Sequence, residues 1–262
     1  MCSPNAGPSI AATGPMFLTL FPHFQPTPFP TTDRNQPMIS RKLTILFMVV
    51  AMPVTSIFAG GEEGWTVLFD GTSTDQWQDY KGGPIGKGWT IEDGALTLSG
   101  KPGGDVTTKQ TYSDFDFRFE WKISRRGNSG IIFLSRAGDP ASYMSGPEFQ
   151  ILDDAKMKNA EKSKTSTGAL YALVAAEGKQ LNPAGEWNSG RIVKDGKNLQ
   201  HWVNGKKVVE TTIGDAAWDK MVANSKFKQW PQFGKTTKGH LILQDHGKQV
   251  WYRNIKIKDL SK

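Results

Sequence analysis

Cysteine is almost absent from this chain. The 262 residues include one cysteine, Cys2, which leaves none in residues 60–262. That part of the chain therefore cannot form a disulfide, bind zinc through cysteine or attack a substrate with a thiol. Its stability must come from a hydrophobic core, and about 200 residues are enough to build one.

Long hydrophobic runs and dense patches of charge are also lacking. The apolar run from Leu43 to Met52 is about half as long as a helix that spans a bilayer. The formal net charge is +7, but the basic residues are spread out. They do not form the stripe with stacked aromatic residues that marks a nucleic-acid interface. We therefore expect no nucleic-acid partner and no membrane span in the mature protein.

The short motifs that mark common enzyme classes are missing as well. The sequence contains no HExxH zinc motif, phosphate-binding loop, nucleophile elbow or EF-hand loop. Helical periodicity is rare, and only Asp153–Lys162 and Ala216–Phe227 are expected to form short helices. Residues 212–238 are the longest irregular stretch, which predicts a lid or a rim.

The first 59 residues have the features of a leader. Residues 1–37 are rich in Pro, Ser and Thr, and we expect a disordered leader or a stretch upstream of a true start at Met38. Residues 38–59 combine a basic start, a short apolar core and a small residue, Ala59, which are the parts of a signal peptide. We therefore predict export to the periplasm or the cell exterior, with a retained N-terminal anchor as the alternative, and a single domain over residues 60–262.

The pattern of that domain is typical of β-strands. Phe115 to Trp121 alternates aromatic and charged residues, and Asp93-Gly94 and Asn204-Gly205 are two-residue hairpin turns. With 28 glycines in the chain, this pattern predicts an all-β sandwich or jelly roll. The expected strands are Trp65–Phe69, Trp89–Ile91, Ala95–Leu98, Phe115–Trp121, Gly130–Arg136, Glu148–Leu152, Gly168–Val174, Trp187–Lys194, Leu199–Val203, Lys206–Glu210, His240–Gln244 and Val250–Ile257.

Polar residues within one of these strands indicate a site. Glu148 and Gln150 alternate with Phe149 and Ile151, so the two polar side chains share one face of the strand. A solvated outer face is the simplest explanation for such a pair. An otherwise aliphatic strand favours a binding or catalytic role instead, because buried polar groups are costly unless they are used.

The same alternation groups polar residues on two other strands. Gln244 and His246 share one face, and so do Trp187 and Arg191. His246 precedes a turn, where an imidazole can serve as an acid, a base or a metal ligand, although a lone histidine is more often structural. For His201, beside a tight hairpin, we expect a structural role.

Several motifs, in the same order along the chain, resemble one family. They are Trp65 to Gly71, Asn128 to Ile131, Glu148 to Asp153, Thr167 to Tyr171, Gly185 to Asn188, Gln200 to Gly205, Leu243 to Gly247 and Arg253 to Ile255. Residues 64–260 are similar to the DUF1080 family, the 3-keto-disaccharide hydrolase domain, also described as 3-keto-glucoside 1,2-lyase/3-keto-2-hydroxy-glucal hydratase. The family usually has a bulkier residue before Arg191, where this chain has Gly190. The resemblance implies a concanavalin A-like lectin/glucanase jelly-roll sandwich and a carbohydrate substrate with a ketone at C3.

The implied reaction begins at C2 of the sugar, because a ketone at C3 acidifies the C2 hydrogen. A base removes that hydrogen, the C1 glycosidic oxygen leaves by β-elimination, and water adds to the resulting glycal, so the net reaction is hydrolysis. This chemistry needs a base, a group that stabilises the enolate and an acid for the leaving group. The candidate catalytic residues are Glu148, His246 and Tyr171. The candidate substrate-binding residues are Gln150, Arg191, Gln244, Trp187 and Arg136.

Two further expectations concern partners of the site. A divalent metal held by Glu148, His246 and Asp153 is an alternative stabiliser of the enolate, and no other cofactor is expected. A sugar 3-oxidoreductase would have to supply the keto group, so a functional link to such an enzyme is expected.

Two other functions are compatible with the same fold class. A glucanase would carry Glu-x-Asp-x-x-Glu on one strand, whereas this chain has Glu148-x-Gln150-x-x-Asp153. A non-catalytic, lectin-like module would use some of the nine tryptophans to stack on sugar rings. The amide at Gln150 argues against the first alternative. Sugar affinity without turnover would identify the second.

Overall fold

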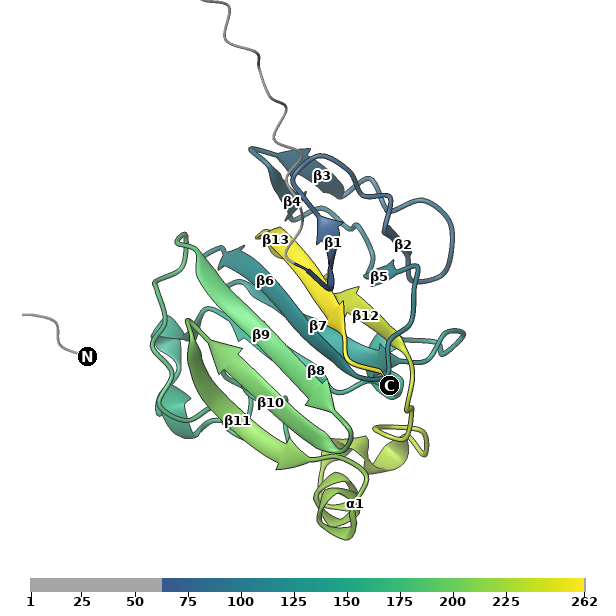
Figure 1. Ribbon diagram of the computed structural model, residues 1–262. Helices are drawn as coiled ribbons and strands as arrows, with labels where there is room; N and C mark the ends of the chain where they lie inside the picture. Colours follow the sequence, from purple (N-terminus) through teal and green to yellow (C-terminus); the bar gives the residue numbers. More distant parts are fainter. Residues whose placement is uncertain (1–62, 262) are drawn as a thin grey trace, which may run out of the picture. The chain divides into compact units, whose positions relative to one another are not determined.

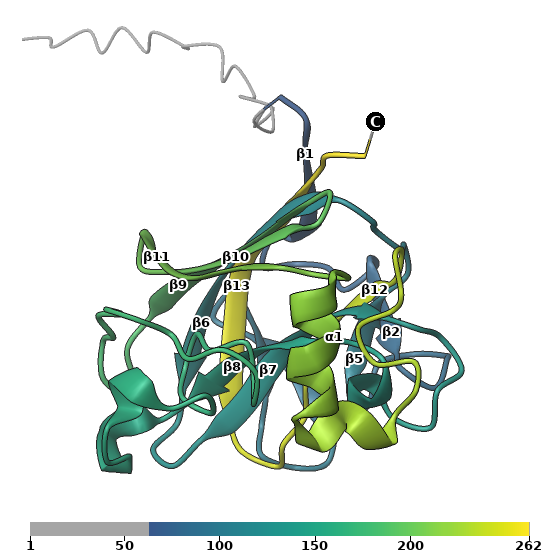
Figure 2. The ribbon, with the colours of Figure 1, turned by 90° about the horizontal axis from the view of Figure 1, so that it is seen from below.

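The protein is a sandwich of two antiparallel β-sheets, as the computed structural model of residues 63–261 shows. In Figure 2, strands β9, β10 and β11 lie in one layer, and strands β5, β7 and β8 lie in the other. The expected all-β jelly-roll sandwich of the concanavalin A-like type is therefore confirmed. The predicted leader, residues 1–59, lies outside the described residues. Among residues 63–261, no helix is long and apolar enough to cross a membrane.

The larger sheet has eight strands in the order β11-β10-β9-β6-β13-β4-β3, with β1 also paired to β13 (Figure 1). Their bounds are β1 Trp65–Phe69, β3 Trp89–Glu92, β4 Ala95–Leu98, β6 Phe115–Ile123, β9 Asn188–Asp195, β10 Asn198–Val203, β11 Lys206–Thr212 and β13 Val250–Asp259. Strand β13 is therefore both the last strand in sequence and an interior strand of this sheet.

The smaller sheet has five strands in the order β2-β5-β12-β7-β8. Their bounds are β2 Trp77–Asp79, β5 Val106–Thr108, β7 Asn128–Ser135, β8 Glu148–Leu152 and β12 His240–Leu243. Strands β2 and β5 were not expected from the sequence, because three residues are too few for a period of two to be recognised.

Between residues 63 and 261, helical structure is confined to short segments. Helix α1 spans Ala216–Ala223, and the Asp215 side chain caps it by accepting a hydrogen bond from the Trp218 backbone N–H at 2.7 Å. The 3-10 turn η4 follows at Lys226–Gln229. The helix expected over Asp153–Lys162 is two separate 3-10 turns instead, η2 at Asp154–Lys156 and η3 at Ala160–Lys162; the remaining turn, η1, lies at Ser142–Met144.

The two hairpin turns have the backbone that their sequences predict. Asp93 and Gly94 have φ angles of 50° and 72°, and Asn204 and Gly205 have φ angles of 46° and 78°. Positive φ at both central residues is the mark of the type I′ turn, whose twist matches that of the flanking strands.

The strand expected over Gly168–Val174 is wrong. Gly168 and Ala172 have φ angles of 82° and 59°, and this left-handed backbone cannot continue an extended strand. Only isolated bridges remain, from Leu170 to Phe149 and to Val174.

The core lies between the sheets and is rich in aromatic side chains. Phe117, Phe119 and Trp121 of β6 all point inward, as their alternation predicts. Phe149 of β8 meets the rings of Phe119 and Trp121 edge-on, with centroids 5.5 and 5.9 Å away, a preferred geometry for aromatic pairs. This contact joins the two sheets and fixes which residues of β6 and β8 face outward.

His201 belongs to this core, in line with its expected structural role. Its ring lies against Phe133 and Phe149, and its Nδ1–H donates to the Gly168 carbonyl oxygen at 3.0 Å. Burial lowers the pKa of His201 to about 4, because an imidazolium loses its hydration there. The ring is therefore neutral near pH 7 and cannot serve as a proton donor to a ligand.

Candidate active site

Glu148 is the first residue of β8 and lies on the outer face of the five-stranded sheet. It pairs with Ile132 of β7, and Gln150 pairs with Gly130. Phe149, between them, packs into the core, so the predicted separation of polar and apolar faces is confirmed. A Cβ atom at Gly130 would clash with the Glu148 carboxyl group. Glycine at this position therefore provides the space that the carboxyl occupies.

The Glu148 carboxyl group is almost completely buried, with 7% of the residue exposed. Burial raises its pKa to about 8, the charge of Asp105 raises it further, and the charge of Lys226 opposes the shift. Within the described chain, no side-chain hydrogen bond satisfies this carboxyl. A desolvated acid of this kind is mostly protonated at pH 7 and is a stronger base than an exposed glutamate once it is deprotonated.

Asp105, immediately before β5, is a second, partly buried acid whose charge acts on Glu148. Its carboxylate accepts hydrogen bonds from Ser142 Oγ at 2.5 Å and from the Asp245 backbone N–H at 2.8 Å. Desolvation raises its pKa, those two hydrogen bonds oppose the increase, and so does the charge of His246. Asp105 therefore ties the turn that carries His246 to the start of β5.

Lys226 brings a positive charge to Glu148. It comes from residues 212–238, the irregular segment for which the sequence predicts a lid or a rim. It begins turn η4, and its Nζ lies 4.1 Å from the centre of the Tyr171 ring. The backbone N–H of Tyr171 in turn donates to the Glu148 carbonyl oxygen at 2.9 Å. Glu148, Tyr171 and Lys226 are thus held together, although they come from three distant parts of the chain.

The two glutamines differ in what their amide groups can do. Gln150 Nε2 donates to the Thr165 carbonyl oxygen at 3.3 Å, and its Oε1 accepts from the Ile151 backbone N–H at 3.1 Å. The Gln244 Oε1 atom is buried and has no partner in the described chain, while its backbone N–H bonds the Gly130 carbonyl oxygen. Gln150 therefore stabilises the fold around the site, and Gln244 retains an acceptor for a ligand.

Residues 64–258 match the family model described as the 3-keto-alpha-glucoside-1,2-lyase-like domain. The chain belongs to this family. A relative from Bacteroides thetaiotaomicron named 3-keto-disaccharide hydrolase is 30% identical over 230 residues, which cover 76% of this chain and 79% of that protein.

Two solved structures from Parabacteroides distasonis ATCC 8503 are also similar, and both are provisionally described as glycosyl hydrolases. One has a TM-score of 0.68 and 33% identity, covering 76% of this chain and 95% of that one. The other has a TM-score of 0.58 and 27% identity, covering 76% of this chain and 84% of that one.

The candidate residues of this family member do not all lie together. Arg191 and Trp187 lie on the outer face of the eight-stranded sheet, where Arg191 forms a two-bond ion pair with Asp116 and Trp187 stacks under Arg253. Arg136 is paired with Asp139 in a local turn, and its side chain is 53% exposed. None of these three side chains contacts Glu148.

The metal set expected from Glu148, His246 and Asp153 is not assembled. No group of three His, Cys, Asp or Glu residues in the described chain could hold a metal ion. Both carboxylate oxygens of Asp153 are used by the backbone, since they accept from the N–H groups of Arg126 at 2.7 Å and Ala155 at 3.2 Å. Asp153 therefore closes the turn after β8.

Asp105 and Lys226 were not expected from the sequence. Asp105 precedes a strand of three residues, and Lys226 is one of several lysines in an irregular segment. The one usable signal was that irregular segment itself, because long loops in compact domains are often functional.

The Lys226 cation beside Glu148 is suited to stabilise negative charge that develops on a bound carbohydrate. Replacing Lys226 with methionine is therefore expected to lower the rate of carbohydrate cleavage about 10²- to 10³-fold, the usual cost of removing one such group. The pKa of Glu148 should rise at the same time, because the lysine charge lowers it. Steady-state rates across pH would measure both effects. Lys228→Met, on the same turn and also exposed, is the matched control; equal losses in both variants would contradict a specific role for Lys226.

Proposed function

We propose that this protein cleaves the glycosidic bond of 3-keto-glycosides by elimination and rehydration. The observation that carries the proposal is the buried Glu148 carboxyl, with a pKa of about 8, beside the cation of Lys226 and the unpartnered amide oxygen of Gln244. Membership of the 3-keto-alpha-glucoside-1,2-lyase-like family and the name of the Bacteroides relative support the same reaction.

In the proposed first step, the Glu148 carboxylate removes the C2 proton of the sugar. The electron pair of that C–H bond forms the enolate, and Lys226 stabilises the negative charge on the C3 oxygen. The enolate then restores the C3 ketone as a C1–C2 double bond forms and the C1–O bond breaks. The leaving oxygen takes a proton from His246, an exposed residue that follows Asp245, whose backbone N–H bonds Asp105 at 2.8 Å.

The second step returns the enzyme to its starting state. Water adds its oxygen to C1 of the glycal and gives one proton to His246, which lost its own to the leaving oxygen, and the proton on Glu148 returns to C2. The product is a free 3-keto sugar, and the sum of both steps is hydrolysis. Tyr171, which packs against Lys226, is the second proton donor. Neither step uses the pair of carboxylates that flanks the bond in ordinary glycosidases.

The glucanase alternative has less support from the same strand. Its middle acid is replaced by Gln150, whose amide is bound to the backbone. Its last acid is Asp153, whose carboxylate is used in a turn. Glu148 alone of the three positions retains a free acid.

The decisive experiment is turnover of a 3-keto-glucoside, with detection of the glycal intermediate by mass spectrometry. We expect a substrate deuterated at C2 to react more slowly, because the C2–H bond breaks in the first step. The value of kcat/KM should rise with pH, reach half of its maximum near pH 8 and level off above that pH, since it reports the pKa of the base in the free enzyme. Cleavage of an unoxidised β-glucan at a higher rate than the keto sugar would overturn the proposal.

A further inference from the structure

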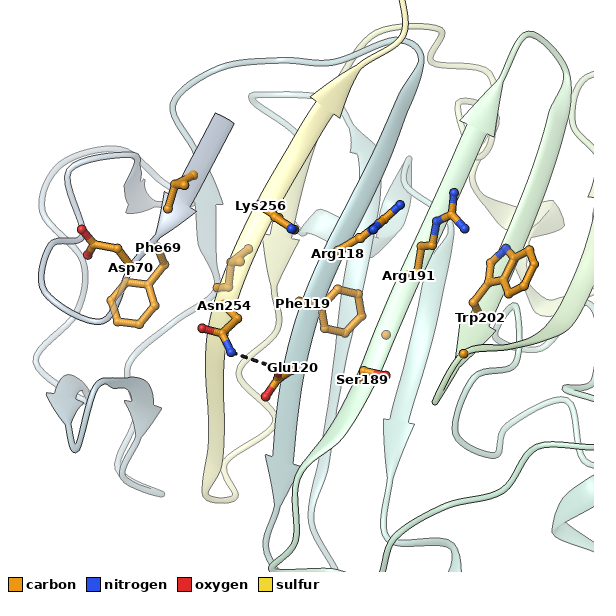
Figure 3. A pocket seen from close by; sticks show the side chains of 14 residues that line it. Phe69, Asp70, Arg118, Phe119, Glu120, Ser189, Arg191, Trp202, Asn254 and Lys256 are labelled. Carbon is orange, nitrogen blue, oxygen red and sulfur yellow. Dashed lines mark hydrogen bonds between the residues drawn. The ribbon is translucent and has the colours of Figure 1, made fainter. Parts of the chain in front are cut away.

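A cavity lies on the outer face of the eight-stranded sheet, and Glu148 is not among the residues that line it. Its volume of about 770 Å³ falls within the range of small-molecule sites, about 300–1,000 Å³. Figure 3 shows that its side chains come from neighbouring strands: Lys256 from β13, Arg118 from β6, Arg191 from β9 and Trp202 from β10. The proposed reaction does not use this cavity.

Three cations lie next to one another across this face. In the strand register, Lys256 lies directly opposite Arg118. Arg118 lies opposite Arg191 on the next strand, and Arg191 lies opposite Trp202 on the one after it. Residues opposite each other on adjacent strands have Cβ atoms about 4.5–5.5 Å apart, and like charges in such positions are destabilising. The neighbouring charges of Arg118 and Arg191 therefore cost stability, and a ligand of opposite charge would reduce that cost.

One buried carboxylate holds two of these cations in place. Asp116, with a side chain 8% exposed, accepts from Nε and Nη2 of Arg191 at 2.8 Å each. It also accepts from the same two atoms of Arg118, at 3.3 and 3.0 Å. The Nη1 group of each arginine has no partner in the described chain, so both guanidinium groups are oriented in advance and keep donors for a ligand.

The rest of the cavity suits a sugar ring. Trp202 lies beside Arg191, with the guanidinium carbon 5.2 Å from its ring centre, and Val67, which is 49% exposed, provides an apolar wall on β1. Asn254 and Ser189 add neutral hydrogen-bonding groups, although the Asn254 amide also bonds Glu120 at 2.9 Å. Aromatic and apolar surface beside planar donors can receive the two sides of a pyranose, its C–H face and its hydroxyl edge.

We propose that this cavity is a second carbohydrate site, which binds a sugar carrying a carboxylate. The carboxylate lies against the Nη1 groups of Arg118 and Arg191, and the ring lies toward Trp202. Charge complementarity favours an acidic over a neutral sugar at the two arginines, because Asp116 offsets only one of their two charges and the carboxylate of Glu120 is bound to Arg253 at 2.7 Å. The carboxylate of Asp70 also lines the cavity, but it lies on the far side of β13 from the arginines (Figure 3). The site is on the face opposite to Glu148, and its ligand need not be the substrate.

The test compares two disaccharides that differ by one carboxylate, cellobiouronic acid and cellobiose, binding to the full chain in titration calorimetry. We expect the acid to bind at least tenfold more tightly, with an affinity that falls as salt rises. Arg118→Gln should weaken binding of the acid about tenfold or more while turnover of the 3-keto-glucoside is unchanged. Arg118→Lys should show an intermediate loss, because lysine keeps the charge but not the two-donor geometry.

Arg125→Gln, in an exposed turn at the end of β6, is the matched control and should bind as the unaltered protein does. Lys256→Gln provides a second probe of the cation row should Arg118→Gln fold poorly. Three results would overturn the proposal. The first is equal affinity for both disaccharides, and the second is unaltered binding of the acid by a folded Arg118→Gln or Lys256→Gln variant. The third is displacement of the acid by the 3-keto-glucoside. If the unaltered protein binds the acid as expected but does not turn over the 3-keto-glucoside, the proposed reaction is wrong and the second site is not affected.

Discussion

Replacing Glu148 with glutamine is expected to lower turnover strongly and to stabilise the folded protein in alkaline solution. A positioned base contributes about 10²- to 10⁴-fold to a rate, and glutamine cannot accept the C2 proton. Elimination of the 3-keto-glucoside should therefore fall by at least about 10³-fold. Rates measured by release of the leaving alcohol, together with unfolding by urea at several pH values, would test both parts of this prediction.

The gain in stability follows from the pKa of Glu148. The folded state holds the proton up to about pH 8, whereas the unfolded chain releases it near the ordinary glutamate pKa of 4.5. Between these values the unfolded state binds fewer protons, so the free energy of unfolding decreases as pH rises. Over the full pKa shift, the free energy of unfolding decreases by about 3–5 kcal/mol. Glutamine does not ionise, so the Glu148→Gln variant does not lose this stability as pH rises. Glu92→Gln, at an exposed position, should change neither quantity; a Glu148→Gln variant less stable than the unaltered protein at pH 8 would refute the assignment.

Replacing Gly130 with alanine should lower kcat about 10²-fold with little loss of stability. The new Cβ would clash with the Glu148 carboxyl, which must then move, and a displacement of about 1 Å at a reacting group costs a factor of this size. The backbone gains from the change, because alanine in a strand loses less conformational entropy than glycine. Rates and thermal unfolding on the same preparation would separate the two effects.

Ile132→Val is the control for this variant. Ile132 lies on the same face of β7, opposite Glu148, and its truncation costs about 0.5–1.5 kcal/mol without placing an atom near the carboxyl. We expect a small loss of stability and an unchanged kcat. If Gly130→Ala retains full kcat, the position of the carboxyl is not critical and Glu148 is not the base.

The sequence predicts which side chains of a strand face outward better than it predicts which strands lie next to each other. Alternation identified Glu148 and Gln150 as outward-facing, and turn chemistry located the hairpins at Asp93-Gly94 and Asn204-Gly205. Alternation also identified Arg191 as outward-facing. It gives no information on which of the two sheets a strand joins, so it could not show that Arg191 and Glu148 lie on opposite outer faces of the sandwich.

The composition of the site depended on contacts between residues far apart in the chain. Asp105 meets Ser142 and Asp245 only in the folded state, and no local pattern predicts that meeting. The interpretation of Gly168–Val174 as a strand failed for a local reason, because a non-glycine residue, Ala172, has a positive φ angle that sequence alone did not suggest. The family resemblance predicted the chemistry, and the burial of Glu148 made it a specific proposal.

The position of β13 determines when this protein can fold. Strand β13 pairs with β6, β4 and β1, three strands that precede it by more than a hundred residues. Until β13 has been synthesised, these strands have no common partner, and the aromatic side chains of β6 have no completed sheet to support them. A nascent chain must therefore remain open until its final strand leaves the ribosome, and the long sequence separations predict slow, late closure. Chaperones would have the whole period of synthesis in which to bind it.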